Sequence, residues 1–379
     1  MTNVRNHNPR PRRISRREFI KLAAITGLLA GCRPAEPPAA PPSEPIALPP
    51  PAPTTVPTAT PATPAPTPTP APTATPTAAP WRPEVIQMYP DVPSRVVRAR
   101  HAGVWDGDNL VPEALGQMLD ASITNLTGLD DVNAAWAALF DPGERIAIKV
   151  NTILGSSGWT RVPLVTAVTG RLQAAGIPPE QIIVFDRDTY ELINAGYTIN
   201  QDKPGVRCYG TDGDYTEGWT VADIDVRLSN ILLDCDALIN MPIVKQHMYA
   251  GVSFAMKNHY GTCDRPSFLH PPHTARAIAE LNALAPIRDR QRLIVGDVLT
   301  VVLGDNWESS TPGDSILMSF DPVAADTVAL QLFSEVRTAS GKDPAGYVEK
   351  ANAWLANSVE LGLGTNDPGQ MELVELNVG

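Results

Sequence analysis

Five short apolar segments, each followed by polar or charged residues, constrain the fold of this chain more than any other feature. They are residues 145–151, 182–185, 232–240, 293–297 and 316–320. Between the first two lies a segment that begins near Pro163, has helical spacing and ends at Gly176, which is the pattern of a βαβ unit. Short apolar strands are typical of a parallel sheet buried on both faces. We therefore predict an α/β fold, a mostly parallel sheet covered by helices on both faces, in a single large domain.

Other segments fit around this sheet. Helical spacing, N-caps and stop signals predict helices at residues 111–119, 131–140, 274–284, 322–333 and 348–359. Weaker strands are expected at 95–99 and 371–376, and a loop at 303–315. Residues 189–228 include Gly210, Gly213 and Gly218 among many Asp and Tyr residues, so we expect an excursion from the core sheet there.

The N-terminus has the features of an export signal. Arg16 and Arg17 stand in Ser-Arg-Arg-Glu-Phe-Ile-Lys, the twin-arginine pattern, and an apolar segment of only eight residues (22–29) follows. It ends in Leu-Ala-Gly-Cys32, a lipoprotein processing sequence. We therefore interpret residues 1–32 as a signal peptide read by the twin-arginine export machinery. Cys32 would carry the lipid that anchors the exported protein to the membrane. The alternative is an uncleaved anchor with an incidental cysteine.

Residues 33–80 consist almost entirely of Pro, Ala and Thr. Such a segment has too few large apolar side chains to build a core, and its prolines favour extended polyproline conformations. It is interpreted as a disordered stalk that separates an α/β domain at residues 81–379 from the membrane surface.

Charge restricts the class of partner. The chain carries a net charge of −11, and residues 1–31 hold seven Lys or Arg and one Glu, so removal of the signal leaves −17. A body this acidic lacks the basic footprint that nucleic-acid binding needs. Only six lysines remain beyond the signal, which makes their positions informative.

The cysteines argue against an iron–sulfur cluster. Beyond Cys32 the chain has only Cys208, Cys235 and Cys263, which are widely spaced and form no Cys-x-x-Cys pair. Three scattered thiols do not supply the four ligands of such a cluster. One disulfide with one thiol left over, or three small buried residues, are both open.

Residues 239–263 contain most of the candidate site. An apolar strand is stopped by Pro242, and Lys245, His247, Lys257 and Asn258 follow. Ligands of open α/β sheets bind beyond the carboxyl ends of the strands. Lys245 could act as a base or nucleophile and His247 as a proton relay or metal ligand, while Lys257 and Asn258 would bind the substrate. The alternative is an ordinary loop held by hydrogen bonds.

Lys149 and Asn151 share one face at the end of an earlier strand and are assigned to substrate binding, unless Lys149 is a solvated edge residue. Asp186 and Asp297 end strands, where catalytic carboxylates often lie, although each could cap a turn. Asp326 falls beyond the first turn of its helix, and we expect it to face the pocket and pair with a lysine.

Three histidines suggest a metal site. His270 and His273 flank two prolines before a predicted helix, and with His247 they would form a three-histidine zinc site with an open position. His259 is interpreted as structural.

With these residues in place, the chain resembles the family called domain of unknown function 362, from about Arg145 to the end. The matching motifs are Lys149-x-Asn151, Asn240-x-Pro242-x-x-Lys245-x-His247, Lys257-Asn258-x-x-Gly261, Asp297, the run Asp321-Pro322-Val323-Ala324-Ala325-Asp326, and Leu361-Gly362-Leu363-Gly364. The resemblance implies a fold and a site but no reaction. Some relatives carry ferredoxin-type cysteine clusters, which this chain lacks.

These observations lead to one hypothesis and two alternatives. The chain is expected to be an exported, lipid-anchored enzyme that acts on a small anion, held by Lys149, Lys245 and Lys257. His247 would carry out acid–base chemistry with Asp297 or Asp326. The alternatives are a lipoprotein that binds the anion without turnover and a histidine-ligated metal enzyme. The sequence identifies no cofactor.

Overall fold

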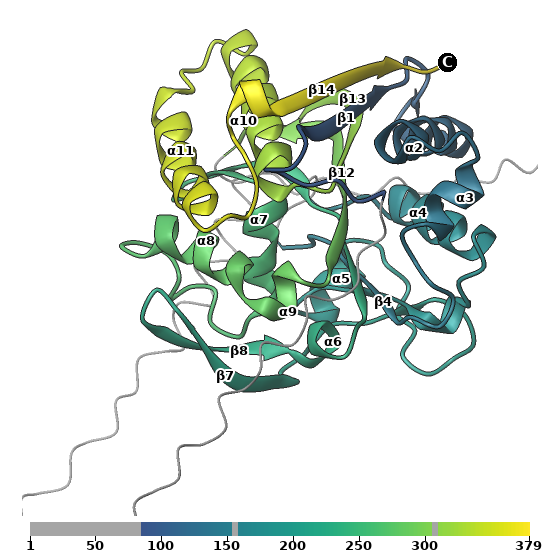
Figure 1. Ribbon diagram of the computed structural model, residues 1–379, viewed down its shortest axis with the longest axis horizontal. Helices are drawn as coiled ribbons and strands as arrows, with labels where there is room; N and C mark the ends of the chain where they lie inside the picture. Colours follow the sequence, from purple (N-terminus) through teal and green to yellow (C-terminus); the bar gives the residue numbers. More distant parts are fainter. Residues whose placement is uncertain (1–84, 154–157, 305–309) are drawn as a thin grey trace, which may run out of the picture. The chain divides into compact units, whose positions relative to one another are not determined.

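The computed structural model describes residues 85–153, 158–304 and 310–379 (Figure 1). The predicted signal peptide, Cys32 and the stalk lie outside these residues and stay predictions. Among the described residues, no helix is long and apolar enough to cross a bilayer.

A ten-stranded sheet forms the centre of the fold. Its main path runs, in spatial order, through β14 (Met371–Asn377), β1 (Ser94–Arg100), β13 (Ser310–Ser319), β12 (Gln291–Val302), β9 (Ala237–Asn240), β4 (Ile146–Lys149), β5 (Ile182–Phe185) and β6 (Arg207–Cys208). Off this path, β10 (Ile243–His247) pairs with β12 and β11 (Gly251–Ser253). Only the pairings of β13 with β1 and β12, and of β10 with β11, are antiparallel. The sheet is therefore mostly parallel, which confirms the predicted fold class.

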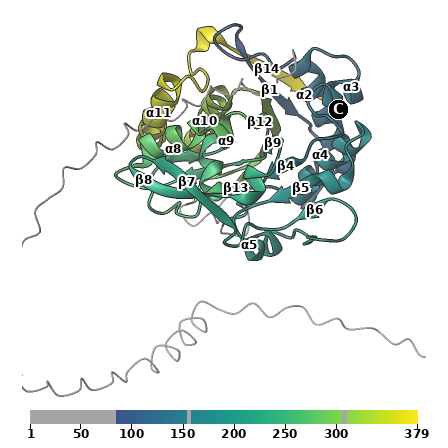
Figure 2. The same cartoon turned by 60° about the horizontal axis from the view of Figure 1, so that its bottom comes forward.

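Helices cover both faces of this sheet (Figures 1 and 2). On one side lie α2 (Pro112–Thr127), α3 (Val132–Ala137) and α4 (Val162–Ala174), and on the other α8 (Thr274–Ala283), α10 (Pro322–Ala339) and α11 (Ala345–Glu360). The strands supply both cores because successive side chains point to opposite faces. In β4, Ile146 and Ile148 join one apolar cluster and Ala147 joins the other.

Short elements complete the described chain. They are β2 (Trp105–Asp106), β3 (Asn109–Leu110), β7 (Tyr215–Val221), β8 (Ile224–Ser229), α5 (Thr189–Asn194), α6 (Asn230–Leu233), α7 (Ala255–Asn258) and α9 (Ala285–Arg288). Three 3-10 turns are η2 (Pro179–Gln181), η3 (His259–Thr262) and η4 (Pro368–Gln370). Within the expected excursion at 189–228, β7 and β8 form a separate two-stranded sheet, but β6 joins the main one.

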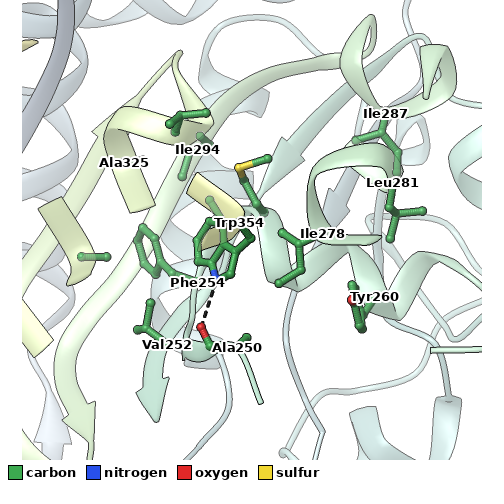
Figure 3. Packing of buried hydrophobic residues seen from close by; sticks show 14 of the residues in the cluster. Ala250, Val252, Phe254, Tyr260, Ile278, Leu281, Ile287, Ile294, Ala325 and Trp354 are labelled. Atoms are coloured by element: carbon green, nitrogen blue, oxygen red, sulfur yellow. Dashed lines mark hydrogen bonds between the residues drawn. The ribbon is translucent and has the colours of Figure 1, made fainter. Parts of the chain in front are cut away.

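The turn between β10 and β11 is held against α11. Trp354 packs beside Phe254 in the apolar cluster, and its indole Nε1 donates a hydrogen bond of 2.9 Å to the carbonyl of Ala250 (Figure 3). Gly251 has a φ of 82°, and a Cβ there would overlap the Tyr347 carbonyl oxygen. Only glycine allows this approach without strain, so a turn that borders the site is fixed by contacts with a distant helix.

Several local predictions were wrong in extent. The segment 232–240, predicted as a strand, begins inside α6, and the helix predicted at 111–119 continues to Thr127. The loop expected at 303–315 is shorter, because β13 already begins at Ser310. The strand expected to end at Asp297 continues to Val302, since its partner β13 extends the pairing. Cys208, Cys235 and Cys263 are free and buried, which favours the interpretation as small buried residues over a disulfide.

Candidate functional site

The candidate site is a cavity of about 370 Å³ beyond the carboxyl ends of β4 and β5. It is closed by β10, β11, α7 and the segment 266–270. Eight candidate residues named from the sequence line it, namely Lys149, Asn151, Asp186, Lys245, His247, Lys257, Asn258 and His270. The expected convergence of the three lysines is therefore present, because neighbouring parallel strands end at one edge of the sheet. Their roles stay predictions.

Lys149 is paired with an acid inside the protein. Its ammonium lies 2.7 Å from Asp186 Oδ1, and both side chains are nearly inaccessible to solvent. It also donates to the carbonyl of Val150 at 2.6 Å and to Asn258 Oδ1 at 3.3 Å. Three acceptors match its three protons. A Cβ at Gly261 would lie 2.7 Å from both the Lys149 ammonium and the Asp186 carboxylate, so glycine makes room for this pair.

Lys245 connects the sheet to the loop after β4. Its ammonium donates to Asn151 Oδ1 at 2.6 Å and to the carbonyls of Ile153 and Gly158 at 3.2 and 3.1 Å. Burial lowers the pKa of Lys245 to about 7, while the nearby carboxylates of Asp186 and Glu191 act in the opposite direction. Lys245 thus holds one wall of the cavity in place.

The amides form a buried chain between the lysines. Asn151 Nδ2 donates to Asn258 Oδ1 at 2.9 Å, and Asn258 Nδ2 donates to Asn240 Oδ1 at 2.8 Å. Asn240 Nδ2 in turn donates to Gln291 Oε1, which also lies 2.8 Å from His259 Nε2. His259 is therefore structural, as expected, and the chain fixes where each ammonium lies.

Lys257 is placed differently from the other two lysines. It comes from the short helix α7, is 7% exposed and lies with its ammonium 3.4 Å from the centroid of the Tyr260 ring. Burial, followed by the nearby charges of Lys245 and Lys149, lowers the pKa of Lys257 well below its ordinary value.

His247 and His270 lie side by side in the wall, with ring centroids 5.2 Å apart. His247 Nδ1 accepts hydrogen bonds from the backbone amides of Tyr249 and Ala250, so the neutral ring carries its proton on Nε2. Burial lowers the pKa of His247 to about 2, which favours the neutral ring. The proton-relay role of His247 stays a prediction.

The described lining carries an excess of positive charge. Three lysines and Arg187 are basic, and only Asp186 and Glu191 are acidic. Burial and the proximity of Asp186 raise the pKa of Glu191, which adds to the imbalance. In a protein of net charge −11, this cavity is an electropositive exception.

Asp297 is not part of the cavity, contrary to the sequence prediction. It is completely buried in the middle of β12, where it accepts hydrogen bonds from the Arg161 guanidinium at 3.0 and 3.1 Å and from the Arg161 amide at 2.9 Å. The prediction failed because β12 continues past Asp297. This carboxylate instead fixes the start of α4.

Asp326 does not pair with a lysine either. Its carboxyl accepts hydrogen bonds from the backbone amides of Ala255 and Met256 at 3.1 and 2.8 Å, so it holds the first turn of α7. Burial raises its pKa to about 8, while the two amides act in the opposite direction. Asp326 faces its neighbouring helix, and the predicted catalytic role is wrong.

The three-histidine metal site is not assembled. His247 and His270 line the cavity, but His273 precedes α8 outside it, because Pro271 and Pro272 separate the two rings. Among the described residues, no group of three or more His, Cys, Asp or Glu side chains is arranged to hold a metal ion.

Sequence reasoning missed several lining residues. Arg187, Glu191 and Tyr260 were not proposed, whereas Asp186 was considered as a strand-end carboxylate or turn cap but not as the partner of Lys149. Asp186 and Arg187 follow a strand directly, a signal equal to that of Lys149. Tyr260 lies three residues after Lys257, a spacing at which side chains meet along a helical turn.

Fold and site together define an α/β protein with a buried, lysine-lined cavity at the carboxyl edge of a mostly parallel sheet. Residues 146–331 match the family described as "Domain of unknown function (DUF362)". This match confirms the resemblance predicted from the lysine and asparagine motifs, all of which fall inside it. The motif at residues 361–364 lies beyond the matched segment. No curated protein matches the chain.

Two solved structures are similar in parts of their fold. A protein from Thermotoga maritima is 10% identical, with a TM-score of 0.34 over 68% of this chain and 60% of that chain. The lactate racemase apoprotein from Thermoanaerobacterium thermosaccharolyticum is 10% identical, with a TM-score of 0.32 over 62% of this chain and 55% of that chain. The chain thus spans less than two thirds of either protein, and neither likeness bears on activity.

Proposed function

We propose that this chain is an exported, lipid-anchored enzyme that binds a small anion in the lysine-lined cavity and acts on it there. The observation that carries the proposal is the excess of basic over acidic side chains around a cavity of about 370 Å³. Buried charges without compensation are costly. An anionic ligand would compensate the excess, and the cavity has the size typical of small-molecule sites.

The roles within the cavity follow from the contacts. Lys149 and Lys245 contribute positive potential from fixed positions, and Asn151 and Asn258 hold them there. Lys257 would meet the anion directly, because it faces the cavity without a carboxylate partner among the described residues. The fixed ammonium groups of Lys149 and Lys245 supply the positive charge, which stabilises an anion more strongly in a dry cavity than in water.

The binding step can be tested with simple probes. Calorimetry with propionate and with inorganic phosphate should detect binding to the full chain, and Lys257→Met should weaken it by at least about tenfold. Lys342→Met is the matched control, because Lys342 is exposed and does not line the cavity. Binding of neither probe, or an equal loss in both variants, would contradict an anion site.

Turnover separates an enzyme from a binding lipoprotein that uses the same cavity. The purified chain would be incubated with a small-molecule cell extract, and consumption of one anion with appearance of another would be followed by mass spectrometry. We expect such a conversion, absent with Lys257→Met and retained with Lys342→Met. Stoichiometric retention of an unchanged anion would support the binding protein instead.

Export and anchoring rest on the N-terminal motifs alone. Replacing Arg16 and Arg17 by lysine should hold the protein inside the cell, and Cys32→Ser should abolish labelling by a radioactive fatty acid. Cell fractionation and labelling measure the two effects separately. Export that persists without the arginine pair would contradict the twin-arginine route.

A further inference from the structure

Lys257 is the chemically distinct lysine of the cavity. Lys149 and Lys245 each donate to three oxygen acceptors, which account for all three ammonium protons. Among the hydrogen bonds of the described residues, none involves the Lys257 amine. Its contact is with the face of the Tyr260 ring, 3.4 Å from the centroid, and it borders the cavity directly.

The surroundings of Lys257 favour the neutral amine. The side chain is 7% exposed, and Lys149 and Lys245 repel a third positive charge. The ring face of Tyr260 can stabilise an ammonium, whereas burial and the charges of Lys245 and Lys149 lower the pKa of Lys257. A neutral amine has a lone pair, and here the lone pair has no protein hydrogen-bond donor to occupy it.

We propose that Lys257 is a nucleophile that forms an imine with the carbonyl carbon of a small 2-oxo carboxylate bound in the cavity. This inference rests on the proposed anion-binding function and names its substrate class. A nucleophilic amine attacks an electrophilic carbon, and the excess of basic side chains favours binding of a carboxylate on the same small molecule. A carbonyl acid supplies both.

The step balances without a further reagent. The Lys257 nitrogen lone pair attacks the carbonyl carbon, the C–N bond forms, and the carbonyl π electrons move to oxygen. One amine proton moves to that oxygen and gives a carbinolamine. The C–O bond then breaks, the second amine proton leaves with the hydroxyl as water, and the C=N bond forms. His247 carries its ring proton on Nε2, which suits it to donate a hydrogen bond to the oxygen as it becomes negative.

Reductive trapping tests this assignment. The full chain would be incubated at pH 7 with pyruvate and cyanoborohydride, digested and mapped by mass spectrometry. The reduced imine is a secondary amine that adds the mass of pyruvate less one oxygen atom. We expect the adduct on the peptide with Lys257, at least about tenfold above exposed Lys203 and Lys342, since ordinary lysines are almost fully protonated at this pH.

Two controls make the result decisive. Lys257→Met should remove this adduct and Lys342→Met should retain it; if Lys257→Met does not fold, the peptide map of the unaltered chain still decides. Adducts spread evenly over exposed lysines, with Lys257 unmodified, would overturn the proposal. Propionate lacks the 2-oxo group and cannot form the imine, so it tests the anion site separately from the imine. Propionate binding without a pyruvate adduct refutes the imine but leaves the anion site, and absence of both refutes the anion site as well.

Discussion

Removing the Lys149 ammonium tests how the cavity is held together. In Lys149→Met the carboxylate of Asp186 stays buried, 4% exposed, and loses the cation that lay 2.7 Å away. Breaking a buried ion pair from one side typically costs about 3–5 kcal/mol. Asp186 keeps hydrogen bonds from the amide and hydroxyl of Thr152 at 2.7 and 2.8 Å and from the amide of Arg187 at 2.7 Å. We therefore expect a loss near the lower end, about 3 kcal/mol in the free energy of unfolding.

Urea unfolding of four proteins forms a double-mutant cycle for this pair. They are the unaltered chain, Lys149→Met, Asp186→Asn and the double variant, with Lys342→Met as a surface control expected within about 0.5 kcal/mol of the unaltered chain. Because removing both charges leaves neither one unpaired, the double variant should lose less than the sum of the single losses, by at least about 1 kcal/mol. Additive losses would refute the coupling of Lys149 and Asp186.

Three further predictions concern single positions. Asp326→Asn removes one of the two acceptors that hold α7 and should lower the unfolding free energy by about 1–3 kcal/mol in urea; an unchanged value would contradict the capping role. Gly261→Ala places a Cβ 2.7 Å from both charged groups of the Lys149–Asp186 pair, so the thermal midpoint should fall by the equivalent of about 1–3 kcal/mol, and a retained midpoint would contradict the steric argument. Burial lowers the pKa of His259 from 6.5 to about 4, so the unfolded state binds the proton more tightly. The contribution of neutral His259 to the free energy of unfolding is fully present above about pH 6.5, and it decreases by up to about 3 kcal/mol as the pH falls to 4. In His259→Gln the free energy of unfolding, measured in urea at pH 7 and at pH 4.5, should change less with pH. An equal change in the variant and in the unaltered chain would contradict this prediction.

The parts of the fold that were predictable are those encoded locally. Alternation and burial in residues 146–149 identify a strand whatever lies beside it, and Asp321 caps α10 through its own Val323 and Ala324 amides. Lys149 was placed at the cavity edge by the same local logic. Parallel strands bring their carboxyl ends to one side, so the edge was predictable even though the partner strands were not.

Asp297 and Asp326 were misassigned because strand ends and helix faces depend on pairing at a distance. Asp297 lies mid-strand only because β13 pairs with β12 on both sides of it, and its carboxylate is bound by Arg161, 136 positions away. Asp326 faces α7 rather than the cavity, since α10 packs against that short helix. No local pattern in the sequence contains these contacts.

The sequence alone determined the α/β class, the sheet edge expected to bind ligands and the few basic residues available there, because strand periodicity and chain order are local properties. Only the tertiary structure decided which lysine of the described cavity lining has no oxygen acceptor. Lys149 and Lys245 find their oxygen acceptors on loops and strands distant in the chain, whereas Lys257 finds an aromatic ring. The number of hydrogen-bond acceptors around a buried lysine is set by packing among segments distant in the chain. More acceptors stabilise the charged ammonium, and fewer favour the neutral amine.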